Sequence, residues 1–596
     1  RSISDAKRKI SNKRTKRSQI STLRRQLSSL TKELNKVKSY RNRCRVIPVA
    51  PTPIPTPSGP EFMGEENSLA PYRENLSYRE VSYLLNKVAF GGTNEDTQVG
   101  ITQGLTNFVN YLVNKSPDTT IHEKGILWGH RLTDQLNETQ KLWYTTTIKA
   151  SAHYDAIFGN NPFHTWLAVR FWQPHFAVNI SRINLQGSNW GSEALIEYYD
   201  RLRRNALGNF ETFAREMVTD SAMSRWLNNE DNHNDAPNQN FAREFLELFT
   251  LGAKDPITLQ RNYEEDSVVA STAYFSGYYQ DYQSVGNDFY RRLILFDQDL
   301  KDNTVYTVFS GIPGAEINRS FSSDAFVHHI LYNHPNSARF LAERIFAQIA
   351  YPDVPENIVA ELAQDLKNNN FEIKPIIAKI LRSQAFFSSK ARNQCIEAPY
   401  ERFMNFARKV LIRPFSDATQ DDIDRAGWFY WMIEEMSNYS GLSIFEPPSV
   451  FAWKGACGLN RGGARGYGEG FINAQNVVAR SNGGIDLINY ATIQADSTGK
   501  RCSEPDQGEE RNFDYSRFLS SCDLPPRQVV IELADRLFNT TLTESQINIL
   551  TSFLTHEKEG GHLVNYNFNL KQEWSRRRKM SALVSMLFDL IVTNSR

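Results

Sequence analysis

A proline-rich stretch divides this chain into parts that must fold separately. Residues 46–60 contain six prolines, and proline lacks a backbone N–H and has a fixed φ, so the stretch can form neither a helix interior nor a central strand. Such a composition favours extended polyproline II and a semi-rigid spacer. We therefore expect an N-terminal arm over residues 1–45, a linker over residues 46–70 and a helical domain over residues 71–596.

The arm is strongly basic, although the whole chain has a net charge of only +1. Residues 1–48 hold 16 Lys and Arg against two acids, whereas the remainder is mildly acidic. A basic arm favours anionic partners, namely nucleic acid, anionic lipid, an anionic envelope polymer or an acidic protein face. The alternative interpretation is a solvated coiled-coil exterior.

Apolar residues recur in the arm with alternating spacings of three and four, which is typical of a short coiled coil. The repeat consists of Ile20, Leu23, Leu27, Leu30, Leu34 and Val37. We expect residues 3–37 to support a homo-oligomer, and a single helix lying on the globular part is the alternative. Because identical basic strands repel each other, a homodimer would need a counter-anion or an acidic partner.

The rest of the chain shows the periodicity of amphipathic helices. From residue 71 onward, apolar residues repeat with helical spacing in many segments. One region, residues 274–310, is rich in aromatic and β-branched residues and predicts a small hairpin. The glycine-rich residues 455–470 lack phosphate-loop spacing and are interpreted as a surface loop. The expected fold is mainly α: a large multi-helix globular domain with a small β-hairpin insertion, preceded by a short basic coiled-coil helix.

No apolar stretch approaches the roughly 18 residues that a membrane-spanning helix needs, so we expect no transmembrane segment. The chain begins with Arg rather than Met, which is compatible with removal of an N-terminal segment. None of its five cysteines forms a CxxC pair. Cys502 and Cys522 bracket a polar stretch and can close it as a disulfide in an exported protein. The alternative is that both are reduced, buried thiols. Cys44 can cross-link two arms.

The segment most suggestive of chemistry is residues 238–252, with the sequence NQNFAREFLELFTLG. On a helix, its polar stripe contains Asn240, Arg243, Glu244 and Glu247. Arg243 and Glu247 can pair at i, i+4, and the two glutamates can hold a cation or supply a general acid or base. A structural Arg–carboxylate network is the alternative.

A second segment, FWQPHF at residues 171–176, places His175 among aromatic residues. This histidine can be a metal ligand, a base, or a core histidine whose hydrogen bonds are satisfied. The candidates for catalysis are His175, Arg243, Glu244 and Glu247; those for a divalent metal are His175, Glu244 and Glu247; those for a binding cleft are Trp172, Asn238 and Asn240. The sequence contains no HExxH, GxSxG, CxxC or Walker pattern.

Taken together, these segments resemble a bacterial family catalogued as domain of unknown function 1800. Residues 238–252 are similar to its hallmark NENxARELxELxTLG, with Gln239 in place of the usual Glu, and residues 171–176 to its FWxxHF motif. Further segments resemble family motifs in the same order, at residues 84–93, 206–210, 263–269, 275–278, 334–340 and 446–453. The resemblance covers residues 76–595. Two departures are Phe296 before Asp297, where the family usually has His, and Ala452 in place of Gly.

The resemblance implies export, to the periplasm, the outer surface or the medium, and a companion protein of the unknown-function 1501 family. Two functional hypotheses remain open. The first is an exported scaffold or binding protein that acts with a partner and is anchored or oligomerised through its basic helix. The second is a metal-dependent or acid/base enzyme that uses the His/Arg/Glu cluster.

Overall fold

The computed structural model divides the chain into two compact units, residues 1–56 and 57–596. It describes residues 61–116, 143–159, 161–183, 192–255, 257–286, 289–410, 434, 437–438, 441–453, 456–458, 466–467, 469–471, 476, 518–559, 562–566, 568, 579–580 and 582–587. The basic arm, the prolines of the linker and Cys502 lie outside the described residues. The predicted coiled coil and the Cys502–Cys522 pair therefore stay predictions.

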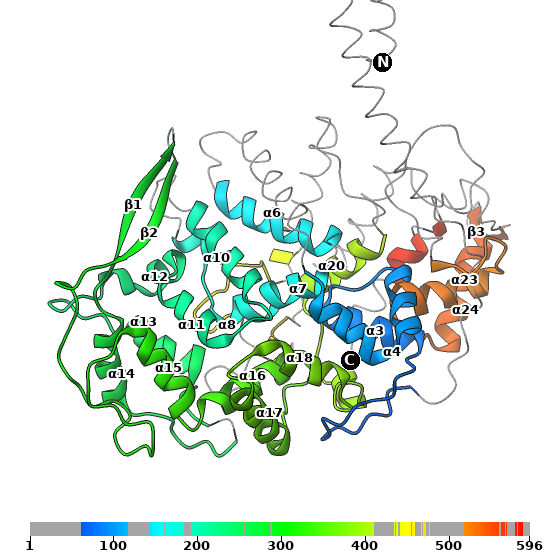
Figure 1. Ribbon diagram of the computed structural model, residues 1–596. Coiled ribbons are helices and arrows are strands. Elements are labelled where there is room, and N and C mark those ends of the chain that lie inside the picture. Colours follow the sequence, from blue (N-terminus) through cyan, green and yellow to red (C-terminus); the bar gives the residue numbers. More distant parts are fainter. Residues whose placement is uncertain are drawn as a thin grey trace, which may run out of the picture. The chain divides into compact units, whose positions relative to one another are not determined.

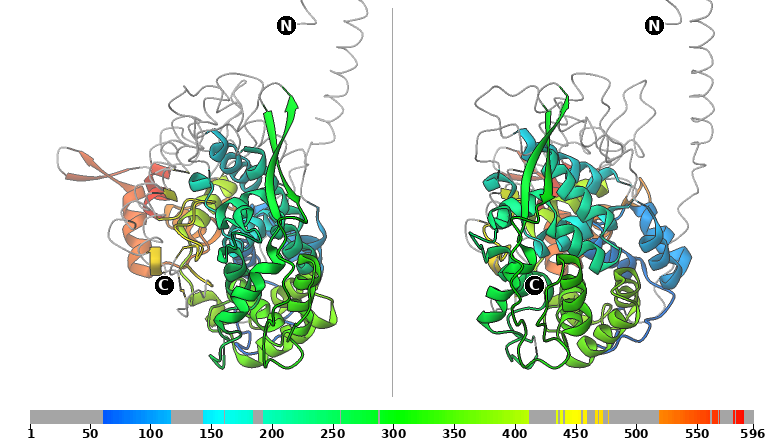
Figure 2. Two further views of the ribbon diagram at one scale, coloured as in Figure 1. Left: turned by 90° about the vertical axis from the view of Figure 1, so that its left-hand side faces the viewer. Right: turned by 60° about the vertical axis from the view of Figure 1, so that its left-hand side comes forward.

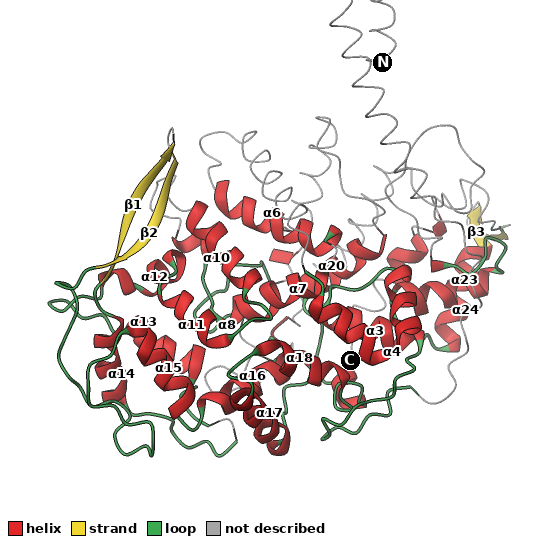
Figure 3. Ribbon diagram, viewed as in Figure 1, coloured by secondary structure: helices red, strands yellow, loops and turns green. Residues whose placement is uncertain are grey.

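Helices dominate the described part of the second unit (Figure 3). In its first half they are α3 (Tyr78–Val88), α4 (Asn94–Asn114), α6 (Trp143–Phe158), α7 (Pro162–Trp166), η2 (Leu167–Trp172), α8 (Gln173–His175), α9 (Ile180–Ile183), α10 (Ser192–Arg204), α11 (Phe210–Val218), α12 (Ser221–Leu227), η3 (Asn229–Asp231), α13 (Asn240–Glu244), η4 (Phe245–Thr250), α14 (Glu265–Thr272) and η5 (Ala273–Phe275). They continue as α15 (Ser323–Asn333), α16 (Ser337–Ile349), α17 (Glu356–Asn368), α18 (Ile373–Arg382), α19 (Ser389–Asn393), α20 (Pro399–Val410), η6 (Glu469–Phe471), α23 (Pro526–Glu532), η8 (Leu533–Leu537) and α24 (Glu544–Thr555). The predicted mainly α fold is confirmed.

Local sequence explains where several helices begin and end. Ser77 caps α3 in a reciprocal capping box with Glu80, which satisfies backbone N–H groups of the first turn. After α3 the chain turns at Gly91, where φ is +79° and an added Cβ would lie 2.6 Å from the Asn405 side chain of α20. The chain leaves α3 through Phe90, whose φ is +51°, and the glycine that follows lets the backbone approach α20.

Two hairpins depart from the helical pattern. Strands β1 (Tyr278–Gly286) and β2 (Phe289–Phe296) pair antiparallel, which confirms the hairpin predicted within residues 274–310, and Figure 1 shows this hairpin beside α12. The sequence did not predict the second hairpin, β3 (His556–Glu559) with β4 (His562–Asn565). Both hairpins project from the helices (Figure 2).

A continuous hydrophobic core joins helices from the start to the end of the second unit. Residues 61–70, which the sequence placed in the linker, also contribute, because Phe62 and Leu69 are buried in this core. The backbone N–H of Phe62 donates to Glu80 Oε1 at 3.2 Å, and Glu80 also pairs with Arg73 at 2.8 Å. Helix α3 thus anchors the segment that leads into the domain.

Among the described helices, none combines the length and the apolar character that a membrane crossing requires.

Candidate functional site

His175 lies at the end of α8 and is fully buried. Its Nε2 lies 3.0 Å from the Phe249 carbonyl oxygen of η4. Because a carbonyl oxygen only accepts, Nε2 must carry the hydrogen in this contact. The rings of Trp172, Phe176 and Phe210 are within 6 Å of the imidazole, centroid to centroid. The FWxxHF motif and the hallmark segment (Asn238–Gly252) therefore do meet, through this hydrogen bond to the backbone.

Trp172 joins the same packing. Its indole N–H donates to the carbonyl oxygen of Ala206 at 2.9 Å, and its ring packs on Phe210 and Phe213. Its side chain is completely buried. The tryptophan that the sequence suggested for a binding cleft thus connects two of the family motifs.

The two asparagines of the hallmark segment organise the connection between α12 and α13. Asn240 Nδ2 donates to the Leu227 carbonyl oxygen at 3.1 Å. The backbone N–H of Asn238 donates to Asn232 Oδ1 at 3.0 Å, and the Asn238 side chain accepts from the N–H of Asn240. The Asn240 side chain thus satisfies a carbonyl oxygen at the end of α12, and the Asn238 side chain satisfies an N–H at the start of α13.

Arg243 pairs with a neighbouring helix instead of with Glu247, one turn along its own helix. Its guanidinium makes a bidentate contact with Glu265 of α14, with Nη1 at 2.8 Å from Oε2. The helix widens into a π-helical turn at Phe245, so positions 243 and 247 lose the α-helical spacing that a direct pair requires. Glu244, by contrast, is buried.

The structure does not gather a metal site from these residues. Within the described part of the chain, no three His, Cys, Asp or Glu side chains lie close enough to hold a metal ion, and His175, Glu244 and Glu247 all belong to that part. The geometry of the hallmark segment is that of helix packing.

A second polar cluster lies where α6 meets residues 434–446. Lys149 Nζ lies 2.5 Å from Glu434 Oε1, 3.0 Å from Glu446 Oε1 and 2.8 Å from Ser443 Oγ. Burial alone would lower the pKa of Lys149, but the two carboxylates raise it above its ordinary value. The lysine is therefore a charged ion-pair partner and is unsuited to act as a base for Ser443.

A cavity of about 580 Å³ lies at a different place, among α3, η2, α20 and the segment that joins η8 to α24. Five basic and two acidic side chains line it among the residues that the structure describes. They are Lys87, Arg170, Arg392, Arg402 and Lys409, with Glu397 and Glu401. None of these residues was a candidate from the sequence, because they come from segments up to about 320 positions apart and share no motif.

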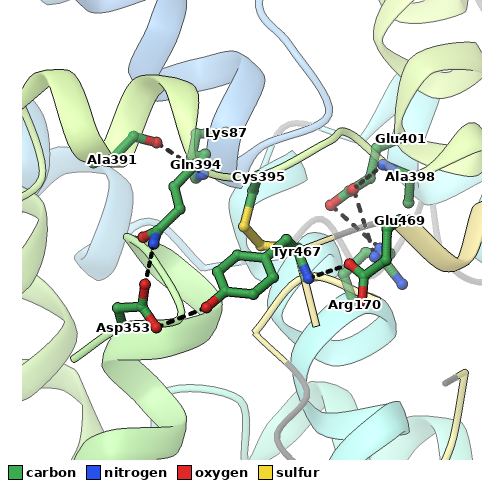
Figure 4. Close-up of a disulfide and its surroundings, with 11 residues drawn as sticks. Lys87, Arg170, Asp353, Ala391, Gln394, Cys395, Ala398, Glu401, Tyr467 and Glu469 are labelled. Atoms are coloured by element: carbon green, nitrogen blue, oxygen red, sulfur yellow. Dashed lines mark hydrogen bonds and ion pairs between the residues drawn. A yellow bond between two sulfur atoms is a disulfide. The ribbon is translucent and has the colours of Figure 1, made fainter. Parts of the chain in front are cut away.

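Both carboxylates of the cavity are already engaged. Glu401 Oε1 lies 3.2 Å from Arg170 Nε and accepts from the indole N–H of Trp166 at 3.0 Å, while Glu401 Oε2 accepts from the backbone N–H of Ala398 (Figure 4). Glu397 pairs with Arg402 at 2.9 Å. These contacts fix the two carboxylates on the wall.

The two lysines are held differently. Lys87 Nζ donates to the Ala391 carbonyl oxygen at 3.3 Å, and Lys409 Nζ to the Leu537 carbonyl oxygen at 2.8 Å. Burial lowers the pKa of Lys87 to about 8 against the opposing influence of Glu401 and Glu397. It lowers the pKa of Lys409 to about 7, where Glu397 opposes the shift.

A disulfide joins Cys395 to Cys457 (Figure 4), and both residues line the cavity. Next to it, the N–H of Ile396 donates to the Tyr467 carbonyl oxygen at 2.8 Å, and the Tyr467 hydroxyl donates to Asp353 Oδ1 at 2.8 Å. The sequence analysis missed this pair because a separation of 62 residues carries no local signal. Cys522 is disulfide-bonded as well.

The fold is mainly α, and the polar residues of the hallmark segment hold helices together. The cavity with its basic lining lies at a different place. The chain belongs to the family described as "Protein of unknown function (DUF1800)", which matches residues 83–587. No curated protein and no solved structure matches the chain.

Proposed function

We propose that this protein is an exported scaffold or binding protein that acts with a partner protein and is anchored or oligomerised through its basic N-terminal helix. The observation that carries the proposal is the Cys395–Cys457 disulfide. Disulfides form and persist in oxidising compartments and are rare in the cytosol. The disulfide bond of Cys522 is a second observation of the same kind.

The contacts of the polar residues in the family motifs support binding over catalysis. Asn240, Arg243 and His175 make hydrogen bonds or ion pairs that hold helices together. A catalytic acid, base or nucleophile needs to reach a substrate, and these three side chains are committed to helix packing.

The arm supplies the proposed attachment. Its charge, 16 Lys and Arg against two acids over residues 1–48, suits an anionic envelope polymer or an acidic protein face. The proposed companion is a protein of the unknown-function 1501 family, and residues 3–37 are the proposed oligomerisation segment.

Two measurements on the full chain in its native cells test this proposal. Fractionation combined with thiol labelling before and after reduction should place the protein outside the cytoplasm, with Cys395 and Cys457 reactive only after reduction. Recovery from the cytoplasm with both thiols already reactive would reject export.

Deletion of residues 1–60 tests the role of the arm. The deletion should release the protein from its envelope fraction and lower its oligomeric state, while the melting temperature of the globular unit is retained, since the described core begins at Phe62. Unchanged localisation and assembly would reject anchoring through the arm.

A further inference from the structure

Among the described residues that line the cavity, the positive charges outnumber the negative ones. In this described lining, five basic side chains face two carboxylates, and those carboxylates pair with Arg170 and Arg402. Lys87, Lys409 and Arg392 remain, and among the described residues no carboxylate lies within 4.0 Å of the amines of the two lysines. A cavity with an excess of cations favours an anion.

Neutral contacts hold these remaining cations in place. Each lysine amine donates to a backbone carbonyl oxygen, and the Arg392 guanidinium lies over the Phe62 ring, 4.5 Å from its centroid. A carbonyl or a ring face offers only partial negative charge, so each cation retains the capacity for a charge-assisted hydrogen bond with a ligand.

The remaining wall offers hydrogen-bonding groups beside apolar surface. Asn86 and Asn405 line it from α3 and α20, and Thr540 and Thr541 line it from the segment after η8. Trp166 and Phe406 contribute apolar surface. The volume of about 580 Å³ lies within the range of about 300–1,000 Å³ that is usual for small-molecule sites.

We propose that this cavity binds a small organic anion that carries several hydroxyl groups, such as a sugar acid or a sugar ester of a tetrahedral oxyanion. Lys87 and Lys409 contact the anionic group, and the amide and hydroxyl side chains contact the ligand hydroxyls. The inference rests on the proposed binding role and adds the site and the ligand class.

The binding should weaken as the pH rises. The charged groups that act on the amine of Lys409 are Glu397 and Arg402, and those that act on the amine of Lys87 are Glu401 and Glu397. An anion binds the protonated amines more tightly, and burial places the pKa of Lys409 at about 7 and that of Lys87 at about 8. Affinity is therefore greatest below pH 7 and falls through both values.

Calorimetric titration of the full chain with three probes tests the proposal. The probes are glucuronate, glucose 6-sulfate and uncharged glucose; the two anions stay ionised from about pH 6 to about pH 9 and distinguish a carboxylate from a tetrahedral oxyanion. At least one anion should bind about tenfold more tightly than glucose, and about tenfold more tightly at pH 6 than at pH 9.

Matched substitutions locate the site. Lys409→Met and Lys87→Met should each weaken binding of that anion about tenfold, whereas Lys254→Met, which removes an exposed lysine outside the cavity, should leave it unchanged. The pH series uses the unaltered protein, so it remains decisive if a cavity variant fails to fold.

Three outcomes would overturn the proposal: neither anion binds, glucose binds as tightly as both anions, or binding survives both cavity substitutions. Each can occur in a protein that is exported and anchored as proposed. Failure of this inference is thus distinguishable from failure of the proposed function.

Discussion

The hallmark segment and the cavity both contain buried or half-buried polar groups, but the protein satisfies them to different degrees. In the hallmark segment, Arg243 meets Glu265, and the Phe249 carbonyl oxygen meets His175. In the cavity, Lys87 and Lys409 have only backbone carbonyl oxygens as hydrogen-bond partners among the described residues. The most recognisable motif of the chain therefore marks helix packing, whereas the unbalanced charges lie where unrelated segments converge.

The largest expected effect is on the packing side of this comparison. His175→Ala removes a fully buried ring and leaves the Phe249 carbonyl oxygen without its donor. We expect a loss of about 3–5 kcal/mol in the free energy of unfolding, measured by urea unfolding. His175→Phe keeps a ring in place and should lose less. Unfolding of His175→Ala at the wild-type urea midpoint would show that the histidine does not stabilise the packing.

A smaller effect on stability is expected in the cavity, and it should depend on pH. The pKa of Lys409 is lowered to about 7 in the folded state, below its unfolded value of about 10.4. Between these values the unfolded state binds more protons, so this lysine makes stability rise with pH. Below about pH 7 the buried amine is protonated, and the free energy of unfolding is lowered by the full cost of burying its charge.

We therefore compare the free energy of unfolding of Lys409→Met with that of the wild type at two pH values. The difference, variant minus wild type, should be greater at about pH 6 than at about pH 9.5, by on the order of 2–4 kcal/mol. Thermal unfolding of the ligand-free proteins at both pH values measures this difference. Lys254→Met, at an exposed position, is the control and should show no such pH dependence. A constant difference between Lys409→Met and wild type would mean that the amine stays protonated in the cavity.

The smallest effect is expected at the exposed ion pair of the hallmark segment. The side chain of Glu265 is 61% exposed and that of Arg243 is 36% exposed, so solvent and salt screen their attraction. Glu265→Gln should cost less than about 1 kcal/mol, and the loss should shrink further in 1 M salt. A loss above about 2 kcal/mol in urea unfolding would contradict a weak surface pair.

The sequence by itself determined the family, the mainly α fold and the hairpin of β1 and β2. These features depend on local periodicity, turn residues and ordered motifs, which the linear sequence contains. Capping followed the same logic, as Ser77 and Glu80 at the start of α3 show.

Only the tertiary structure decided which groups meet. Arg243 pairs with Glu265 because a π-helical turn follows Glu244, and Cys395 pairs with Cys457 across 62 residues. The cavity brings Lys87 of α3 together with Lys409 of α20 and Leu537 of η8. Such contacts depend on which distant helices pack against each other, and the periodicity of a single segment does not specify its packing partner.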